Sequence, residues 1–267
     1  MAFKTPAEIV ETVCGLGRAK GLLRLDKLLL LSFLAGAYIA IGGLLAVVAG
    51  GATTGLKADN TGLQKLVFGA VFPVGLMMVV IAGSELFTGN AATMIPGAFT
   101  GTVRWRELAY NWVVSYVGNF VGSVFVAYCL AYLTGLLAKP PWIDCIRNLA
   151  VAKVGDNPVE AFWPLFWKGV GCNWLVCLAV WMAIAADDIV GKIFACWWPI
   201  MAFVTLGFEH SVANMFFVPA GIFYGANVTW GQFLVNNLIP VTLGNIVGGS
   251  LLVGVIYWYL LGRRREQ

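Results

Sequence analysis

Two short stretches of the chain share a pattern that organises the rest of it. Residues 83–90 read GSELFTGN and residues 207–214 read GFEHSVAN, so Gly, Glu and Asn recur with the spacing Gly-x-Glu-x-x-x-x-Asn. A second pair of stretches, GNFVG at 118–122 and GNIVG at 244–248, is offset by 126 residues, close to the 124 of the first pair. Two matches in register predict an internal repeat that divides the 267-residue chain into halves.

The composition is typical of a membrane protein. Hydrophobic residues make up 60% of the chain and charged residues 11%, whereas a soluble domain carries about 25% charged residues. A soluble chain of this length cannot bury so much apolar surface, but lipid accommodates it. The net charge of +4 is modest, and the basic residues gather at the ends of apolar segments rather than in a stripe. This distribution argues against nucleic-acid binding.

The apolar segments predict an all-α integral membrane protein with six transmembrane helices. These helices are expected near residues 28–49, 66–97, 108–137, 162–186, 193–223 and 233–261. The second and fifth segments are too long for a simple span and contain the repeated pattern, which predicts two broken helices. Each half contains three spans, and because this number is odd the two halves must cross the membrane in opposite orientations. The chain is therefore expected to form an inverted three-plus-three repeat, with its site near the bilayer midplane.

Both ends of the chain are expected on the cytoplasmic side of the membrane. With the N-terminus inside, eleven of the 17 lysines and arginines fall on the inner side and six on the outer side. Residues 1–27 predict an N-terminal amphipathic helix on the membrane surface. Thr5 and Glu8 are expected to form a capping box at the start of this helix. Residues 28–261 then form the transmembrane domain, and residues 262–267 form a basic cytoplasmic tail.

Three ionisable residues inside apolar segments are candidates for the functional site, because charge within a membrane is unfavourable: Glu85, Glu209 and His210. The two glutamates are equivalent in the repeat. A carboxylate is suited to accept hydrogen bonds from the backbone N–H groups that a broken helix exposes. We therefore expect both glutamates to have a structural role, which we favour over direct contact with a substrate. His210 is the only histidine, its repeat position holds Leu86, and an imidazole exchanges a proton near neutral pH.

Three further groups of side chains are of interest. Large apolar residues near the breaks either narrow a pore or pack helices together, and they are Phe72, Leu76, Leu86, Phe87 and Phe203. Lys153 and Lys168 either gather anions at a pore mouth or are ordinary solvated charges. Asparagines in apolar surroundings are expected to form interhelical hydrogen bonds, and they are Asn90, Asn119, Asn173, Asn214 and Asn245.

Motifs for cofactors and for common enzymes are absent from the sequence. The six cysteines form no CxxC pair, and a single histidine makes a His/Cys metal site improbable, so no metal or other cofactor is expected. The chain also lacks the GxxxxGK[ST], HExxH and GxSxG motifs. A soluble enzyme is therefore not expected.

Four motifs resemble those of the formate/nitrite transporter family, and the resemblance covers nearly the whole chain. They are ELFTGN at 85–90, NWLVCLA at 173–179, FEHSVANM at 208–215 and NLIPVTLGN at 237–245. The resemblance implies an aquaporin-like protomer of six spans with two broken helices, although the Asn-Pro-Ala boxes of aquaporins are absent. It also implies homopentamers that have a pore in each protomer and pass formate, nitrite, hydrosulfide or related weak acids.

The same resemblance assigns residues to a substrate pathway. It implies that His210 lies beside the narrow, dry part of the pore, that Thr88 lies in the loop of the second segment, and that Lys153 lies between the third and fourth spans. It further implies a constriction of Phe72, Leu76, Leu86 and Phe203, and pore-facing or pore-supporting asparagines at Asn173 and Asn214.

The expected function is a membrane channel or transporter for a small monovalent weak-acid anion, with formate favoured and with protonation near His210. A nitrite or hydrosulfide channel of the same family is the first alternative. A membrane anchor subunit of a redox enzyme is a more distant one, because it needs metal or haem ligands that this sequence scarcely offers. A water or glycerol pore is disfavoured by the missing Asn-Pro-Ala boxes.

Overall fold

The computed structural model describes residues 3–53, 55, 59–155 and 157–262, and it gives residues 158 and 160 as backbone only. Throughout this part of the chain the regular structure is helical, apart from one β-bridge between Phe3 and Ala186. Six stretches are long and apolar enough to cross a membrane, which confirms the number predicted from the sequence. They are Leu25–Gly51, Thr61–Gly83, Trp105–Tyr132, Ala161–Ala185, Ile189–Leu206 and Trp230–Gly262.

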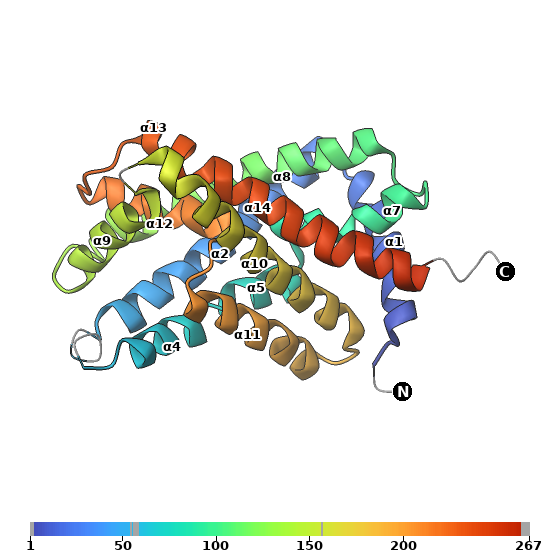
Figure 1. Ribbon diagram of the computed structural model, residues 1–267, viewed down its shortest axis with the longest axis horizontal. Coiled ribbons are helices and arrows are strands. Elements are labelled where there is room, and N and C mark those ends of the chain that lie inside the picture. The colour runs from blue at the N-terminus through green and yellow to red at the C-terminus, as the bar shows by residue number, and fades with distance from the viewer. Residues whose placement is uncertain (1–2, 54, 56–58, 156, 263–267) are drawn as a thin grey trace.

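Several of these stretches combine α-helical and π-helical segments, the latter labelled η (Figure 1). The first half of the chain contains α1 (Pro6–Gly21), α2 (Leu25–Gly51), α4 (Thr61–Val71), α5 (Val74–Met78), η1 (Val79–Gly83), α6 (Phe87–Thr93), α7 (Ile95–Phe99), α8 (Trp105–Phe125) and η2 (Val126–Tyr132). The second half contains α9 (Trp142–Val154), α10 (Pro158–Ala185), α11 (Ile189–Leu206), α12 (Ser211–Phe223), α13 (Trp230–Gln232), η3 (Phe233–Leu238), α14 (Ile239–Gly249), η4 (Ser250–Val255) and η5 (Trp258–Gly262).

The two helical runs that contain the repeated pattern are both interrupted. Between η1 and α6 the chain leaves helical geometry at residues 84–86, and between α11 and α12 it does so at residues 207–210. Gly83 and Gly207 have positive φ angles of 83° and 76°, a backbone region that residues with a Cβ atom rarely occupy. The first N–H groups of α6 and α12 therefore lie inside the molecule and need partners from other segments.

Glycines allow two pairs of long helices to pack with their backbones in contact. In the first half α2 packs on α8, and a Cβ atom at Gly36 would overlap the carbonyl oxygen of Asn119. In the second half α10 packs on α14, and a Cβ atom at Gly244 would overlap the carbonyl oxygen of Phe166. Small residues have this role in membrane helices generally. The matched helix pairs support the inverted repeat, which stays a prediction.

The amphipathic helix α1 packs on protein, which differs from the expectation of a helix lying on the membrane surface. Its apolar face contacts α6, α7, α8, α10 and η5, and its buried residues are Ile9, Val10, Val13, Gly17 and Gly21. Thr5 and Glu8 form the predicted capping box at its start. Just before it, the Lys4 ammonium lies 2.7 Å from Asp187 and lowers the pKa of that carboxyl through their hydrogen bond. The start of α1 is therefore tied to the loop between α10 and α11.

Two glycines of α1 provide a matched test of this packing. A Cβ atom at Gly17 would lie 3.0 Å from the Thr93 carbonyl oxygen, whereas a Cβ atom at Gly15 would meet nothing within 4 Å. We expect Gly17→Ala to weaken the docking of α1 by about 1 kcal/mol. Gly15→Ala should strengthen the helix by up to about 1 kcal/mol. Hydrogen exchange of the α1 amides measures both effects, and faster exchange in Gly15→Ala than in Gly17→Ala would contradict this packing.

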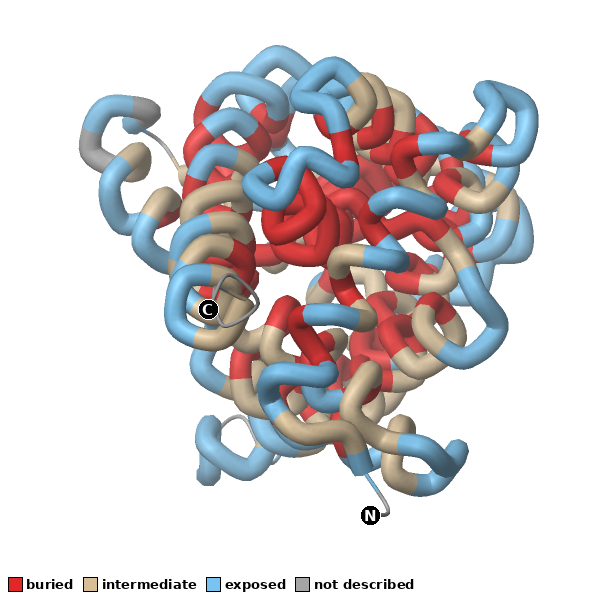
Figure 2. Tube along the Cα trace, turned by 90° about the vertical axis from the view of Figure 1, so that its right-hand side faces the viewer, coloured by how far each residue is buried: buried red, intermediate tan, exposed pale blue. Residues whose placement is uncertain are grey.

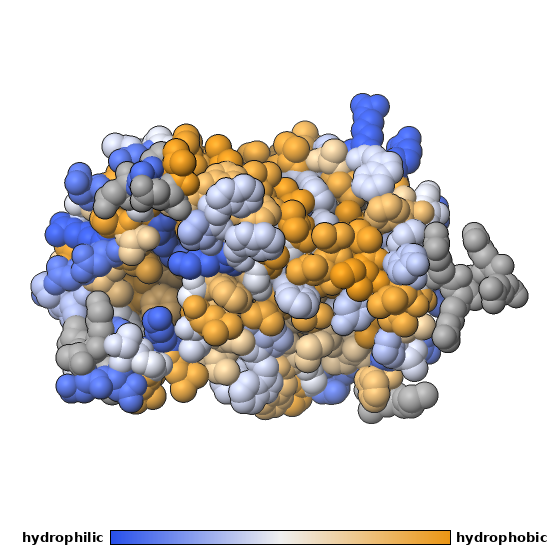
Figure 3. Space-filling view, viewed as in Figure 1, coloured by the Kyte–Doolittle hydropathy of each residue, from blue (hydrophilic) through white to orange (hydrophobic). Residues whose placement is uncertain are grey.

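The surface and the ends of the molecule fit a protein that spans a membrane. Hydrophobic residues cover much of the middle of the face in Figure 3, and hydrophilic ones gather at its left-hand end. Seen from the opposite end, buried residues fill the centre (Figure 2). The first helix, α1, packs on the last one, η5, so both ends of the described chain lie on the same side. Helix α2 begins at Leu25, three residues before the predicted domain boundary. Of the predicted tail, residues 263–267 lie outside the described residues.

Candidate functional site

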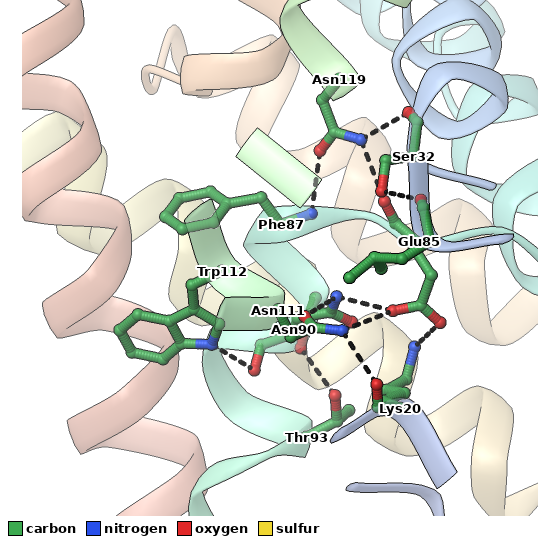
Figure 4. A network of polar contacts seen from close by, with 11 residues as sticks. Lys20, Ser32, Glu85, Phe87, Asn90, Thr93, Asn111, Trp112 and Asn119 are labelled. Carbon is green, nitrogen blue, oxygen red and sulfur yellow. Dashed lines mark hydrogen bonds and ion pairs between the residues drawn. The ribbon is translucent and has the colours of Figure 1, made fainter. Parts of the chain in front are cut away.

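Glu85 lies in the first interruption and is held by side chains from three helices (Figure 4). The Lys20 ammonium of α1 lies 2.7 Å from its Oε1 atom. Asn90 of α6 and Asn111 of α8 donate to its Oε2 atom over 2.8 and 3.4 Å, and Asn90 also donates to Asn111 over 2.8 Å. Because Glu85 is only 6% exposed, these partners compensate for the removal of its charge from water.

Glu209 lies in the second interruption and has two equivalent partners, a lysine and the asparagine five residues further on. The Lys153 ammonium of α9 lies 2.9 Å from its Oε2 atom, to which Asn214 of α12 also donates over 2.7 Å. Asn214 donates in turn to Asn237 over 2.8 Å, as Asn90 does to Asn111. The two clusters thus match residue by residue, with α9 in the position of α1. This match supports the predicted repeat and extends it to the helices that precede the first and fourth spans.

In each interruption an asparagine, and not the glutamate, accepts a hydrogen bond from one of the exposed backbone N–H groups. Asn119 Oδ1 accepts from the N–H of Phe87 over 2.9 Å, and Asn245 Oδ1 accepts from the N–H of Ser211 over 2.9 Å. Their amide groups donate to the carbonyl oxygens of Glu85 and Glu209 over 2.9 and 3.0 Å. The expectation that the carboxylates accept backbone N–H groups differs from this arrangement. The predicted interhelical bonding by asparagines is confirmed.

Some members of these clusters were not singled out from the sequence. Lys20 was assigned to a membrane-surface helix, because helical periodicity identifies an apolar face but does not identify what that face packs against. Asn111 and Asn237 were overlooked, although their offset of 126 residues equals that of Asn119 and Asn245. Extending the repeat along the whole chain is the signal that finds them.

Thr88 and His210 come together where the two interruptions meet. The Thr88 Oγ1 and His210 Nε2 atoms lie 3.0 Å apart, and the residues are 0% and 3% exposed. Thr88 belongs to the first turn of α6, and His210 precedes the first turn of α12. The two halves of the chain thus each contribute one polar group to this contact.

The surroundings of His210 determine which ring nitrogen carries the proton in the neutral form. His210 Nδ1 accepts a hydrogen bond from the backbone N–H of Ala213 over 3.0 Å and so caps α12. A nitrogen that accepts this bond carries no proton, so the proton of the neutral imidazole is on Nε2 and points at Thr88. Thr88 then accepts from His210, and its own hydroxyl proton is left to donate elsewhere. A second proton on the ring requires Nδ1 to release the Ala213 N–H.

Apolar residues surround this contact. The rings of Phe72 and Phe203 meet edge to face with their centroids 5.9 Å apart, and Phe203 stacks on the His210 ring at 5.9 Å. Leu76 and Leu86 belong to the same buried cluster and are 1% and 2% exposed. The structure thus places Phe203 on the histidine and Phe72 on Phe203, and it buries Leu76 and Leu86 in the same core cluster. Their role in a pathway stays a prediction.

Two asparagines near the contact have carbonyl oxygens without a partner. Asn173 of α10 donates to the Thr88 carbonyl oxygen over 3.0 Å and to the Asn245 carbonyl oxygen over 2.6 Å. Its Oδ1 atom, and that of Asn214, accept no hydrogen bond from any residue that the structure describes. Buried acceptors of this kind are suited to bind a water molecule or the hydroxyl group of a passing acid.

Two cavities of similar size, each about 520 Å³, open on opposite sides of this region. The first, which we call the Lys153 cavity, is lined by side chains that include Lys65, Lys153, Lys168, Glu209 and His210. The second, the Lys20 cavity, is lined by side chains that include Lys20, Glu85, Leu86, Asn90 and Lys192. Thr88 lies between the two cavities and contacts His210, which lines the first one.

The cavities contain no cluster typical of a metal site. Within the part of the chain that the structure describes, no group of three or more His, Cys, Asp or Glu side chains is placed to hold a metal ion. None of the six cysteines, all of which lie in the described part of the chain, forms a disulfide bond. The chemistry of the site is that of two buried ion pairs, a threonine, a histidine and an apolar surround.

Comparison with known proteins identifies the family. The family model described as "Formate/nitrite transporter" matches residues 7–259. A probable formate transporter of Methanothermobacter thermautotrophicus is 56% identical, and the alignment covers 97% of each chain. The formate channel FocA of Escherichia coli is 36% identical, with 90% of this chain and 88% of that protein aligned.

Solved structures agree with these relatives. An "FNT family ion channel" superposes with a TM-score of 0.83 at 34% identity, covering 95% of this chain and 98% of that one. A "Pentameric formate channel with formate bound" superposes with a TM-score of 0.75 at 34% identity, covering 90% and 98%. The six apolar stretches are therefore membrane spans of a multi-pass protein. The chain belongs to the formate/nitrite transporter family, a family of membrane transporters and channels and not of enzymes.

Proposed function

We propose that the chain is a formate channel or transporter in which the passing anion is protonated near His210. The observation that carries the proposal is the 3.0 Å contact between Thr88 and His210, buried between two cavities and surrounded by apolar side chains. Relatives named for formate, at 56% and 36% identity, support this substrate. The pentameric neighbour supports a homopentamer of this chain.

The Lys153 cavity is suited to gather the anion. Among the described residues, Lys153, Lys65 and Lys168 line it together with one carboxylate, that of Glu209, so positive charge exceeds negative charge in this part of its wall. A cavity with walls of low dielectric concentrates ions of opposite charge. From there the anion meets the rings of Phe72 and Phe203, where it loses water and its charge becomes unfavourable.

Loss of water makes protonation of formate easier, because a carboxylate in apolar surroundings holds a proton more tightly. The Thr88 hydroxyl has a free proton to donate, since its oxygen accepts from His210 Nε2. In the proposed relay a histidine that has gained a second proton passes its Nε2 proton to Thr88 Oγ1 while Thr88 passes its own to formate. Neutral formic acid then crosses past Leu86 and ionises in the Lys20 cavity.

A plain anion channel is the second candidate, and the hydrogen bond from Ala213 to His210 Nδ1 favours it. That bond stabilises the neutral histidine, which then acts only as a fixed donor to Thr88. Thr88 and the side chains near it hydrogen-bond the passing anion, and no proton moves with it. The two candidates differ in whether formate uptake acidifies the far side.

We also propose that the protein lies in the inner, or cytoplasmic, membrane with both termini in the cytoplasm. The six spans and the packing of α1 on η5 support termini on one side. The excess of Lys and Arg among the loops and ends of that side supports the cytoplasm. Residues 1–27 and 28–261 remain the proposed N-terminal helix and channel domain, and Lys20 makes that helix part of the channel wall.

Formate uptake by liposomes that contain the pure protein tests the proposal. We expect formate added outside to acidify the interior, reported by a trapped pH dye, much faster than in protein-free liposomes. Nitrite and hydrosulfide in the same assay test the alternative substrates of the family. Uptake of labelled formate without acidification would favour the plain anion channel. A folded, inserted protein that takes up no formate would overturn formate as the substrate.

A further inference from the structure

We propose that the Lys153 cavity is also a binding site for aromatic monoanions, such as aryl sulfonates or aryl carboxylates, that are too large to cross. The cavity of about 520 Å³ is far larger than one-carbon formate requires, and it lies within the range of pockets that hold organic ligands. Its lining combines phenylalanine rings with lysines, which is the chemistry that an aromatic anion needs. The binding site does not depend on the proposed function, whereas the block of formate passage does.

The apolar part of the site is built from phenylalanine rings. Five phenylalanines line the cavity, and they are Phe68, Phe72, Phe203, Phe208 and Phe217. Phe217 contacts both Phe68 and Phe72, at centroid distances of 6.0 and 6.4 Å. Aromatic groups bind such walls through stacking and edge-to-face contacts in addition to the burial of apolar area.

The charged part of the site consists of two lysines that form no salt bridge with the described residues. Lys153 is already paired with Glu209 and also lies over the Phe217 ring at 5.5 Å. Lys65 and Lys168 are exposed and line the same cavity. Among the residues that the structure describes, neither forms a salt bridge. Lys65 lies one helical turn before Phe68 on α4, so one face of that helix presents both a charge and a ring.

The Lys20 cavity provides an internal comparison. It has the same volume of about 520 Å³, and lysines line it as well, at Lys20 and Lys192. The described residues of its lining include no aromatic side chain and are aliphatic between the polar groups. The two cavities therefore differ in ring content at similar size, and the aromatic anion should prefer the Lys153 cavity.

The floor of the Lys153 cavity explains why the ligand stops there. Phe72 and Phe203 are 2% and 3% exposed and meet edge to face, with His210 stacked on Phe203. A benzene ring needs these buried side chains to separate, whereas a one-carbon acid is far smaller. A bound aromatic anion thus occupies the path that formate is proposed to take.

Binding of benzenesulfonate to the protein in lipid nanodiscs, measured by equilibrium dialysis without formate, tests the site. This probe keeps its charge at every working pH and does not diffuse through lipid. We expect saturable binding that is about tenfold or more tighter than binding of methanesulfonate, which has the charge without the ring. Phe68→Leu should weaken it about 3- to 10-fold. Lys65→Gln combined with Lys168→Gln should weaken it about tenfold.

Lys192→Gln in the Lys20 cavity is the matched control and should leave benzenesulfonate affinity unchanged. Each variant is first shown to be monodisperse and to unfold at the wild-type temperature. Weaker binding can then be attributed to the substituted side chain and not to misfolding. Absence of saturable binding overturns the proposal, and so does equal affinity for methanesulfonate. A loss in Lys192→Gln that exceeds the loss in the Lys65 and Lys168 variant also overturns it. If formate flux is absent but binding follows this pattern, only the proposed function fails.

Discussion

Replacing His210 with asparagine is expected to lower proton-coupled formate uptake about 10²-fold and to remove most of its dependence on pH. Within the described part of the chain, the imidazole is the titratable group that hydrogen-bonds the Thr88 hydroxyl, and imidazole as a chemical group exchanges protons more readily near neutral pH than other side chains do. Proton transfer by a positioned side chain typically contributes a factor of about 10² or more. Asparagine neither gains nor loses a proton in this pH range, so the relay has no proton donor at this position.

The asparagine variant should still fold, which makes the test specific. His210 caps α12 through Nδ1, and asparagine is among the preferred residues at this position of a helix. Uptake is measured from internal acidification across a range of external pH, together with uptake of labelled formate. A wild-type pH profile in His210→Asn would exclude the proton relay and favour the plain anion channel.

Thr88 supplies the matched controls for this experiment. Thr88→Ser keeps a hydroxyl within reach of His210 and should retain most of the coupled uptake. Thr88→Val keeps the shape but removes the hydroxyl, and it should approach the His210→Asn rate. Equal activity of the serine and valine variants would show that the hydroxyl takes no part.

Replacing Glu209 with glutamine is expected to destabilise the protein by about 3 kcal/mol, because Lys153 is left charged without its partner. The Lys153 and Glu209 side chains are 12% and 9% exposed, and they lie 2.9 Å apart. Removing one member of a buried ion pair costs about 3 to 5 kcal/mol. The lower value applies here because both residues line a cavity that water can enter. Thermal unfolding of the protein in detergent, with a denaturant titration, measures the loss.

Two further variants make the Glu209 result interpretable. Adding Lys153→Gln to Glu209→Gln removes the unpaired charge and should restore a large part of the stability, as a coupled pair requires. Glu107→Gln removes one member of the pair with Arg104, whose side chain is 78% exposed, so it should change stability far less than Glu209→Gln does. Equal losses in Glu107→Gln and Glu209→Gln would contradict a buried, coupled pair at Glu209.

The main outline of the fold was predictable from the sequence because lipid imposes a simple rule. A helix that crosses a membrane needs about 20 apolar residues, so hydropathy alone gives the six spans. The positions of Gly83 and Gly207 were informative for a similar reason, since positive φ angles favour glycine. Segment ends were less accurate: the predicted segment 66–97 contains a span that ends at Gly83, followed by the separate short helices α6 and α7.

The candidate site was only partly predictable. His210, Thr88 and the two glutamates stand out because polar residues are rare in apolar segments, and the family motifs contain them. The partners of the glutamates depend on helices that are distant in sequence. Glu85 and Lys20 are separated by 65 residues, and Glu209 and Lys153 by 56. Periodicity along one helix contains no information on such pairs.

The sequence by itself determined the six spans, the two interruption sites and the family, because each depends on local composition or on a contiguous motif. Only the tertiary structure decided that α1 packs on the bundle and supplies Lys20 to the wall of a cavity. It also decided that Asn119 and Asn245, and not the carboxylates, each accept from one exposed N–H group at an interruption. The physical reason is that a buried polar group must find a partner, but which helix provides that partner depends on packing in three dimensions.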